Sequence, residues 1–183
     1  MTDTATESTA ADSAAQRARL TQDLAARLAQ LSLGLSVDIT TAESCTGGLV
    51  AAALTALPGS SGWFRQGVVT YSNEAKISLL SVPAGVLEQH GAVSEACVLA
   101  MAAGARRESG ARVAVSVSGV AGPDGGSAAK PVGTVWIGWA VGEQLSAEIF
   151  QFSGDRQSVR EQAVVEALHG IIERLDSMEN NLA

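Results

Sequence analysis

The stretch LSVDITTAESCTGGLVAAALTAL, residues 35–57, predicts a strand that runs directly into a helix. Apolar and polar residues alternate over 35–43, which is typical of a β-strand, and the small residues over 47–57 form a helix that a Pro-Gly pair ends. Ser44 stands at the junction. A strand followed at once by a helix is the repeating unit of α/β proteins, so we expect that class of fold.

The alternation of strands and helices continues along the rest of the chain. Ser94 is placed to cap one of the helices, and Gly142-Glu143 joins the last two strands as a hairpin. Together these elements predict an α/β fold of one domain, a three-layer α/β/α sandwich with a mixed β-sheet. The residue patterns place helices over 14–32, 74–80, 95–108 and 156–177, and strands over 67–72, 113–119, 133–141 and 145–153.

The length of 183 residues suits a single domain, which we place at residues 13–177. Residues 1–12 are small and polar and predict a disordered tail, and residues 178–183 predict a frayed one. The N-terminal segment lacks the basic and apolar regions of a signal peptide, and no apolar run approaches the roughly 20 residues that cross a bilayer. We therefore expect a cytoplasmic protein with no membrane partner.

The net charge of −7 argues against a nucleic-acid partner, because such binding relies on Lys and Arg to neutralise phosphates. It leaves room for a small anionic ligand held by one or two local cations. The two cysteines, Cys45 and Cys97, form neither a CxxC pair nor a Cys/His cluster. We therefore expect no metal site.

Ser44 is a candidate nucleophile because it precedes a helix whose N–H groups and dipole favour a developing oxyanion. The simpler alternative is that Ser44 or Thr46 only caps the helix. Gly47 and Gly48 cost a helix start about 1 kcal/mol each relative to alanine, which suggests that the backbone approaches something closely there. Cys45 is a rival nucleophile, but it has no histidine partner, and the role of a small buried apolar residue suits it better.

A serine hydroxyl needs a base to remove its proton. The only histidines, His90 and His169, lie in no motif, so Lys76 is the candidate base, provided that burial lowers its pKa. Tyr71, the only tyrosine, would relay or orient the proton. The alternative is that Lys76 is an exposed helix residue and Tyr71 a ring packed on the sheet.

Two further segments have features of an anion site. The loop AGPDGGS, residues 121–127, is rich in turn residues, and its N–H groups are suited either to a plain turn or to a bound anion. It matches neither a Walker A loop nor a dinucleotide-binding fingerprint. Arg156 is at the start of the last predicted helix, where it suits a phosphate or carboxylate, or a solvated pairing with Asp155.

Five sequence motifs follow one another along the chain: TAESCTGG, PGSSGWFRQGVVTYSNEAK, GAVSE, SGVAGPDGGSAAKPVGTVW and FSGDRQSVREQA. In this order they resemble the CinA C-terminal domain family. The resemblance runs from about residue 20 to residue 175 and includes a loop with Ser118 where threonine is common in the family.

The resemblance implies hydrolysis of the carboxamide of nicotinamide mononucleotide (NMN) to nicotinate mononucleotide and ammonia, in pyridine-nucleotide recycling. It implies a Ser44 nucleophile that forms an acyl-enzyme, a Lys76 base and an assisting Tyr71, with no cofactor. The residues expected to bind substrate are Thr46, Gly47, Gly48, Ser118, Gly122 and Arg156, the N–H groups of 46–48 serving as the oxyanion hole.

Two alternatives stay open at this point. The first is a non-catalytic nucleotide-binding or regulatory module linked to competence or DNA damage, as the name of the family suggests. The second is an enzyme that acts on a different small amide. Family members are often dimers, so we also expect a homodimer, with Trp63 and Phe64 as a candidate contact.

Overall fold

The structure is a computed structural model that describes the backbone of residues 4–180 and the side-chain exposure of residues 13–180. Strands and helices alternate as predicted. The helices are α1 Thr4–Leu35, α2 Leu49–Thr55, α3 Asn73–Leu80, α4 Ala84–His90, α5 Glu95–Ser109 and α6 Arg156–Asn180, with a 3-10 turn at Ser60–Gly62. The strands are β1 Ile39–Glu43, β2 Phe64–Val69, β3 Val113–Gly119, β4 Thr134–Val141 and β5 Gln144–Gln151.

The sheet is mixed, with the strand order β2-β1-β3-β4-β5. Strands β2, β1 and β3 are parallel, whereas β4 and β5 form an antiparallel hairpin on β3. Strand β1 is buried throughout and β3 nearly so, as is usual for strands covered on both faces. The carboxyl ends of β1 and β3 therefore lie side by side, and the β4–β5 turn lies at the opposite end of the sheet.

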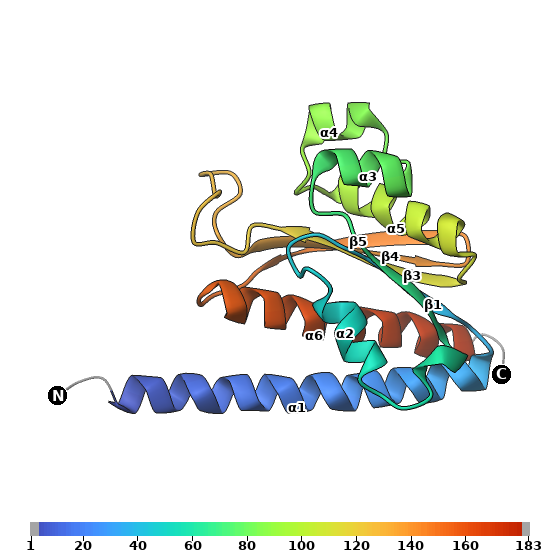
Figure 1. Ribbon diagram of the computed structural model, residues 1–183, viewed down its shortest axis with the longest axis horizontal. Coiled ribbons are helices and arrows are strands. Elements are labelled where there is room, and N and C mark those ends of the chain that lie inside the picture. Colours follow the sequence, from blue (N-terminus) through green and yellow to red (C-terminus); the bar gives the residue numbers. More distant parts are fainter. Residues whose placement is uncertain (1–3, 181–183) are drawn as a thin grey trace.

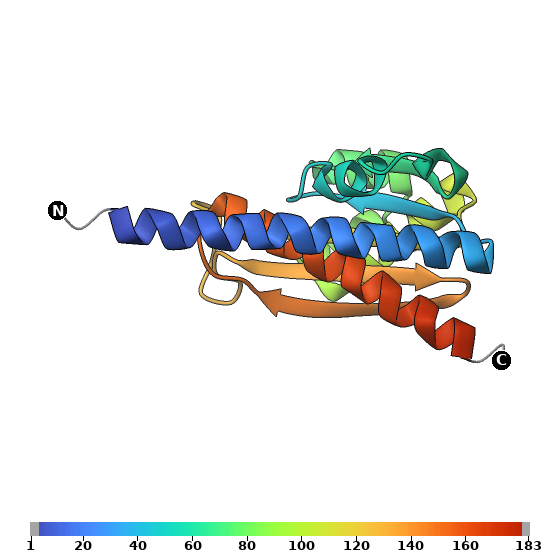
Figure 2. The ribbon, with the colours of Figure 1, turned by 90° about the horizontal axis from the view of Figure 1, so that it is seen from below.

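Helices cover both faces of the sheet, which confirms the predicted three-layer sandwich. Figure 1 shows α3, α4 and α5 on one face and α2 and α6 on the other. Helix α1 adds an outer layer, because it packs mainly on α6 and to a smaller extent on α2 (Figures 1 and 2).

The two faces of the sheet are packed with side chains of different size. Toward α2 and α6 the strands present large side chains such as Ile137 and Trp139. Toward α5 they present alanines, among them Ala42, Ala114 and Ala140, which let that helix approach closely. Gly104 of α5 shows how close the packing is on this side, since a Cβ there would lie 2.1 Å from the Leu80 carbonyl oxygen.

The chain termini differ from the prediction. Helix α1 begins at Thr4, inside the segment 1–12 that was predicted to be a tail, and α6 extends to Asn180. The alanines of residues 4–15 have the highest helix propensity and no Gly or Pro interrupts them, so the helix continues toward the N-terminus. Residues 1–3 and 181–183, the remainder of the predicted tails, lie outside the described residues.

Several internal boundaries also differ. Strand β2 spans Phe64–Val69 and not 67–72, because it pairs with β1 from Ile39 onward and leaves the sheet before Tyr71. Helix α4 was not predicted, since Pro83 and Gly85 indicated a plain connection. The predicted cap at Ser94 is confirmed, because its side chain accepts a hydrogen bond from the Cys97 N–H.

Candidate active site

The predicted site residues come together at the carboxyl ends of β1 and β3. Ser44 follows β1, and its N–H donates to Val117 O of β3 at 2.9 Å. Loop 121–125, α3 and the start of α6 close around this point. They form a pocket of about 310 Å³, a size at the lower end for small-ligand sites. Its lining residues are Ser44, Cys45, Tyr71, Lys76, Ala92, Val93, Ser118–Ala121, Gly122, Asp124, Gly125 and Arg156.

Lys76 is in hydrogen-bond contact with Ser44. The lysine is 1% exposed and its Nζ lies 3.1 Å from Ser44 Oγ. The same nitrogen contacts two backbone carbonyl oxygens, Thr70 O at 2.8 Å and Tyr71 O at 3.5 Å. A neutral amine has two N–H donors for the carbonyls and one lone pair, so its lone pair is left to accept the Ser44 proton.

Burial also changes the charge of this lysine. Desolvation lowers the pKa of Lys76 from its ordinary value of 10.5, because the ammonium form loses its hydration inside the protein. The alternative of an exposed Lys76 is therefore wrong. A buried amine with a lowered pKa is neutral more often near pH 7, as a general base must be.

The rival nucleophile Cys45 is poorly suited to the chemistry. Burial raises the pKa of its thiol to about 11. The reactive form of cysteine is the thiolate, which is scarce at neutral pH when the pKa lies so high. Of the two adjacent candidates, Ser44 is therefore the one with an activating partner.

The turn after Ser44 explains the glycine pair. Gly47 and Gly48 have φ angles of +61° and +96°, a left-handed conformation that favours glycine, and α2 begins only at Leu49. The predicted helix start at 47 is therefore wrong. Glu43, 1% exposed, lies beneath the turn and accepts hydrogen bonds from N–H groups at the start of α2. The donors are Gly48 N at 2.9 Å, Val50 N at 3.1 Å and Ala51 N at 2.8 Å.

These bonds change the prediction for the oxyanion hole. Gly48 N–H donates to Glu43, and Gly47 N–H donates to Ser44 O at 3.1 Å, so neither is available to a substrate. Thr46, Gly47 and Gly48 also do not line the pocket. In the turn 44–48, the N–H groups without an oxygen partner in the described part of the chain are those of Cys45 and Thr46.

The predicted residues on the opposite side of the pocket form a bridge across it. Arg156 Nη2 donates to Tyr71 Oη at 2.8 Å, and Arg156 Nη1 donates to Gly122 O at 2.8 Å. The Tyr71 side chain is 59% exposed, so it is not packed on the sheet. Its carbonyl oxygen contacts Lys76, whereas its hydroxyl contacts Arg156.

Ser118 and Gly122 keep their predicted place in the pocket. Ser118 is 1% exposed, and its hydroxyl donates to Ala92 O at 2.8 Å, which leaves its lone pairs as acceptors. Asp124 lines the same pocket, and its carboxylate disfavours a phosphate beside it. Lys76 and Arg156 are the basic side chains among the lining residues described.

Arg160 is a residue of this region that the sequence analysis missed. It lies one turn beyond Arg156 on α6, and its guanidinium binds the turn of the nucleophile. Nε donates to Cys45 O at 3.1 Å, and Nη2 donates to Thr46 O at 2.7 Å. The spacing of four in the motif DRQSVR is the signal that places both arginines on one face of a helix.

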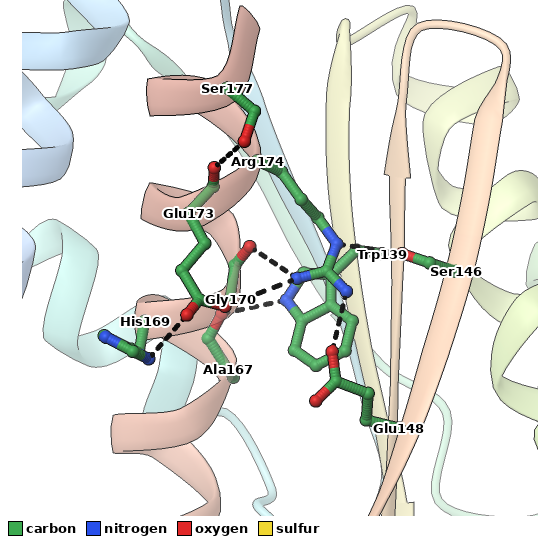
Figure 3. Close-up of polar contacts among 9 residues, drawn as sticks. All are labelled: Trp139, Ser146, Glu148, Ala167, His169, Gly170, Glu173, Arg174 and Ser177. Atoms are coloured by element: carbon green, nitrogen blue, oxygen red, sulfur yellow. Dashed lines mark hydrogen bonds and ion pairs between the residues drawn. The ribbon is translucent and has the colours of Figure 1, made fainter.

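The far end of α6 carries a different cluster. Arg174 lies over the Trp139 ring, 3.9 Å from its centroid, and donates to side chains of β5 (Figure 3). The three tryptophans, Trp63, Trp136 and Trp139, do not line the pocket beside Ser44. A second pocket of about 730 Å³ lies at this end, bordered by Arg112, Arg174 and the β4–β5 turn.

Within residues 4–180, no helix has the length and apolarity needed to cross a membrane. No group of three or more His, Cys, Asp or Glu residues is arranged there to hold a metal ion.

Comparison with known proteins gives one consistent family. Residues 21–175 match the CinA C-terminal domain. The nicotinamide-nucleotide amidohydrolase PncC of Pseudomonas putida is 55% identical over 150 residues, which cover 82% of this chain and 94% of that protein. The nicotinamide-nucleotide amidohydrolase PncC of Enterobacter agglomerans is 61% identical over 132 residues, covering 71% of this chain and 80% of that protein.

A solved structure supports the same assignment. The crystal structure of the competence damage-inducible protein A (ComA) from Klebsiella pneumoniae subsp. pneumoniae MGH 78578 matches with a TM-score of 0.83 and 44% identity. The match covers 85% of this chain and 97% of that one.

Proposed function

This chain belongs to the CinA C-terminal domain family, and we propose that it is an amidohydrolase that converts NMN and water to nicotinate mononucleotide and ammonia. The substrate is taken from relatives named nicotinamide-nucleotide amidohydrolases. The observation that carries the reaction type is the 3.1 Å contact between Ser44 Oγ and the buried Lys76 Nζ. It pairs a nucleophile with a base inside a ligand-sized pocket.

In the acylation half of the reaction, neutral Lys76 takes the proton of Ser44 as Oγ attacks the carboxamide carbon. A C–O bond forms and the carbonyl oxygen becomes an oxyanion. When the C–N bond breaks, the Lys76 ammonium returns the proton to the departing nitrogen, which leaves as ammonia. The result is an ester between Ser44 and the nicotinoyl group.

In the second half, water replaces the nitrogen. Lys76, neutral again, takes a proton from the water molecule as its oxygen attacks the ester carbon. The bond to Ser44 Oγ then breaks, and the proton on Lys76 restores the serine hydroxyl. Thr70 O and Tyr71 O accept hydrogen bonds from Nζ in either charge state, so they hold the amine in place throughout.

The phosphate of the substrate is assigned to Arg156. Its guanidinium lies at the pocket and is bonded there only to neutral oxygens, Tyr71 Oη and Gly122 O, within the described residues. A phosphate is a stronger acceptor than either, so it can replace them. Tyr71 is then released beside the substrate, where its assisting role stays a prediction.

The test is ammonia release from NMN by the purified chain. Ser44→Ala is expected to lower kcat by about 10⁴-fold or more, the scale seen when a nucleophile is removed from a catalytic unit. Nicotinamide riboside and nicotinamide serve as substrates without the phosphate, and we expect them to be poorer. Full activity of Ser44→Ala would contradict the mechanism.

The alternative of a non-catalytic nucleotide-binding module makes the opposite prediction, calorimetric binding of NMN with no turnover. The buried lysine beside Ser44 favours the enzyme, because a binding module gains nothing from a desolvated amine. A homodimer and a cytoplasmic location stay predictions. Trp63 is 3% exposed in the core, so it cannot be the partner contact that its sequence context suggested.

A further inference from the structure

Two charged side chains, those of Glu43 and Arg160, bind the main chain of the turn that follows Ser44. Glu43 accepts from N–H groups at the start of α2, and Arg160 donates to Cys45 O and Thr46 O. Arg160 comes from α6, more than a hundred positions later in the chain: its separation from Cys45 is 115. A half-buried arginine with two charge-assisted bonds to adjacent carbonyls restrains the orientation of both peptide units.

The orientation of these peptides decides where their N–H groups point. In a trans peptide the C=O and N–H bonds are antiparallel. Because Cys45 O faces Arg160, the N–H of the same peptide unit, that of Thr46, points away from α6. Hydrogen bonding at the carbonyl also polarises the peptide and makes that N–H a stronger donor.

The Thr46 carbonyl affects the Cys45 N–H indirectly, through one further hydrogen bond. Because Thr46 O faces Arg160, the Gly47 N–H of that peptide unit points away and donates to Ser44 O at 3.1 Å. This bond in turn orients the peptide that carries the Cys45 N–H. Arg160 thus sets the Thr46 N–H directly and the Cys45 N–H through Gly47, and these are the two N–H groups of the described turn that lack an oxygen partner.

We propose that Arg160 is a positioning residue for the reaction at Ser44: it holds the turn so that the N–H of Cys45, which lines the pocket whereas Thr46 does not, faces the oxyanion. The proposal rests on the proposed function, because an oxyanion forms only if Ser44 attacks a carbonyl. It replaces the predicted hole at residues 46–48. Arg160 itself does not line the pocket, so its effect is transmitted by the main chain.

The experiment compares Arg160→Lys with Arg174→Lys, a control on the same helix whose bonds lie at the far end. Lysine keeps the charge but cannot bind two carbonyls in a fork. We expect Arg160→Lys to lower kcat about 10²-fold, the scale for loss of an oxyanion donor, with KM nearly unchanged. Arg174→Lys should lose stability and keep kcat.

Two further measurements separate positioning from a purely structural role. Guanidinium ion at millimolar concentration is expected to restore part of the kcat of Arg160→Ala. Pyridine-3-boronic acid should form a tetrahedral adduct with Ser44, detected by boron NMR, and bind Arg160→Lys about 10²-fold more weakly. This probe mimics the oxyanion and requires no turnover of NMN.

The outcomes are distinguishable. If the parent chain hydrolyses NMN and Arg160→Lys has the kcat of the parent, the positioning role is wrong and the proposed function stands. If the parent does not hydrolyse NMN but its boronate adduct depends on Arg160, the substrate is wrong and the positioning role stands. If the parent shows neither hydrolysis nor an adduct, both are wrong. A loss in Arg160→Lys that tracks stability alone would also overturn the positioning role.

Discussion

Helix α6 has an arginine near each end, and the two arginines bind different kinds of partner. Arg160 donates to main-chain carbonyls of the turn that carries Ser44. Arg174 donates to Ser146 Oγ, Glu148 Oε1 and Gly170 O, and its guanidinium covers Trp139 (Figure 3). They lie about 21 Å apart along the helix, from a rise of about 1.5 Å per residue.

The side chains buried near the two arginines also differ in kind. At the Ser44 end, the buried side chains include a lysine and a glutamate, Lys76 and Glu43, which cost desolvation energy. At the far end, the buried group is the Trp139 ring, whose Nε1 donates to Ala167 O at 3.1 Å. The difference indicates that one end of the molecule provides chemistry and the other provides stability.

The largest expected effect on kcat comes from replacing one basic residue by methionine near Ser44 and comparing it with the same replacement near Trp139. Lys76→Met removes the base and should lower kcat by about 10⁴-fold or more. Its free energy of unfolding should change little, because the gain from removing a buried amine offsets the loss of its hydrogen bonds. Arg174→Met should keep kcat and lose about 1–3 kcal/mol of stability.

Ammonia release and urea unfolding, measured on both variants, decide the matter. The comparison of the two ends fails if Lys76→Met keeps its activity, or if it loses more stability than Arg174→Met.

Replacing one glycine by alanine near Trp139 and another near Ser44 is expected to have smaller effects, one on stability and the other on kcat. A Cβ at Gly170 would lie 2.3 Å from Trp139 Cζ2, so Gly170→Ala should cost about 1–3 kcal/mol of stability and leave kcat unchanged. A Cβ at Gly47 would lie 3.4 Å from Arg160 Nη2 on a backbone with φ of +61°. Gly47→Ala should lower kcat about 10-fold through displacement of the turn.

The same two assays apply to the glycine variants. Equal losses of kcat in the two would show that the ends are not separate. An unchanged kcat in Gly47→Ala would show that the turn tolerates movement.

The smallest expected effect is a pH dependence found at the Ser44 end alone. Because burial lowers the pKa of Lys76, kcat/KM should rise with pH and level off below the ordinary lysine value of 10.5. Between the lowered pKa and 10.5 the unfolded chain binds more protons than the folded one. The stability due to Lys76 therefore rises with pH in that window.

The measurement is the difference in free energy of unfolding between the parent chain and Lys76→Met across this range. A difference that is flat with pH would contradict a lowered pKa. The parent and Arg174→Met should instead show parallel curves.

Local patterns in the sequence predicted the elements that are set by local forces. The strand Val113–Gly119 has its predicted limits, the Ser94 cap is present, and the hairpin turns at Gly142. These features depend on alternation, capping and turn residues within a few positions. Helix α4 escaped prediction because Pro83 directly before it and Gly85 within it outweighed a short apolar pattern.

The site was predicted only in part, because its contacts join distant segments. The motif around Lys76 has polar neighbours and indicates an exposed helix, and only the packing of α3 on α5, with the amine reaching Ser44, buries Lys76. Gly47 and Gly48 indicated free N–H groups for a ligand, whereas Glu43 and Ser44 O occupy them. Arg160 had no predicted partner at all, since Cys45 lies 115 positions away.

The β4–β5 hairpin has a practical consequence. Its turn, Gly142 and Glu143, is at the end of the sheet remote from the pocket, and the Glu143 side chain is 92% exposed. A foreign peptide spliced into this turn would sit outside both cores and away from the parallel strands that carry Ser44. The hairpin turn is therefore a suitable place to graft a reporter peptide.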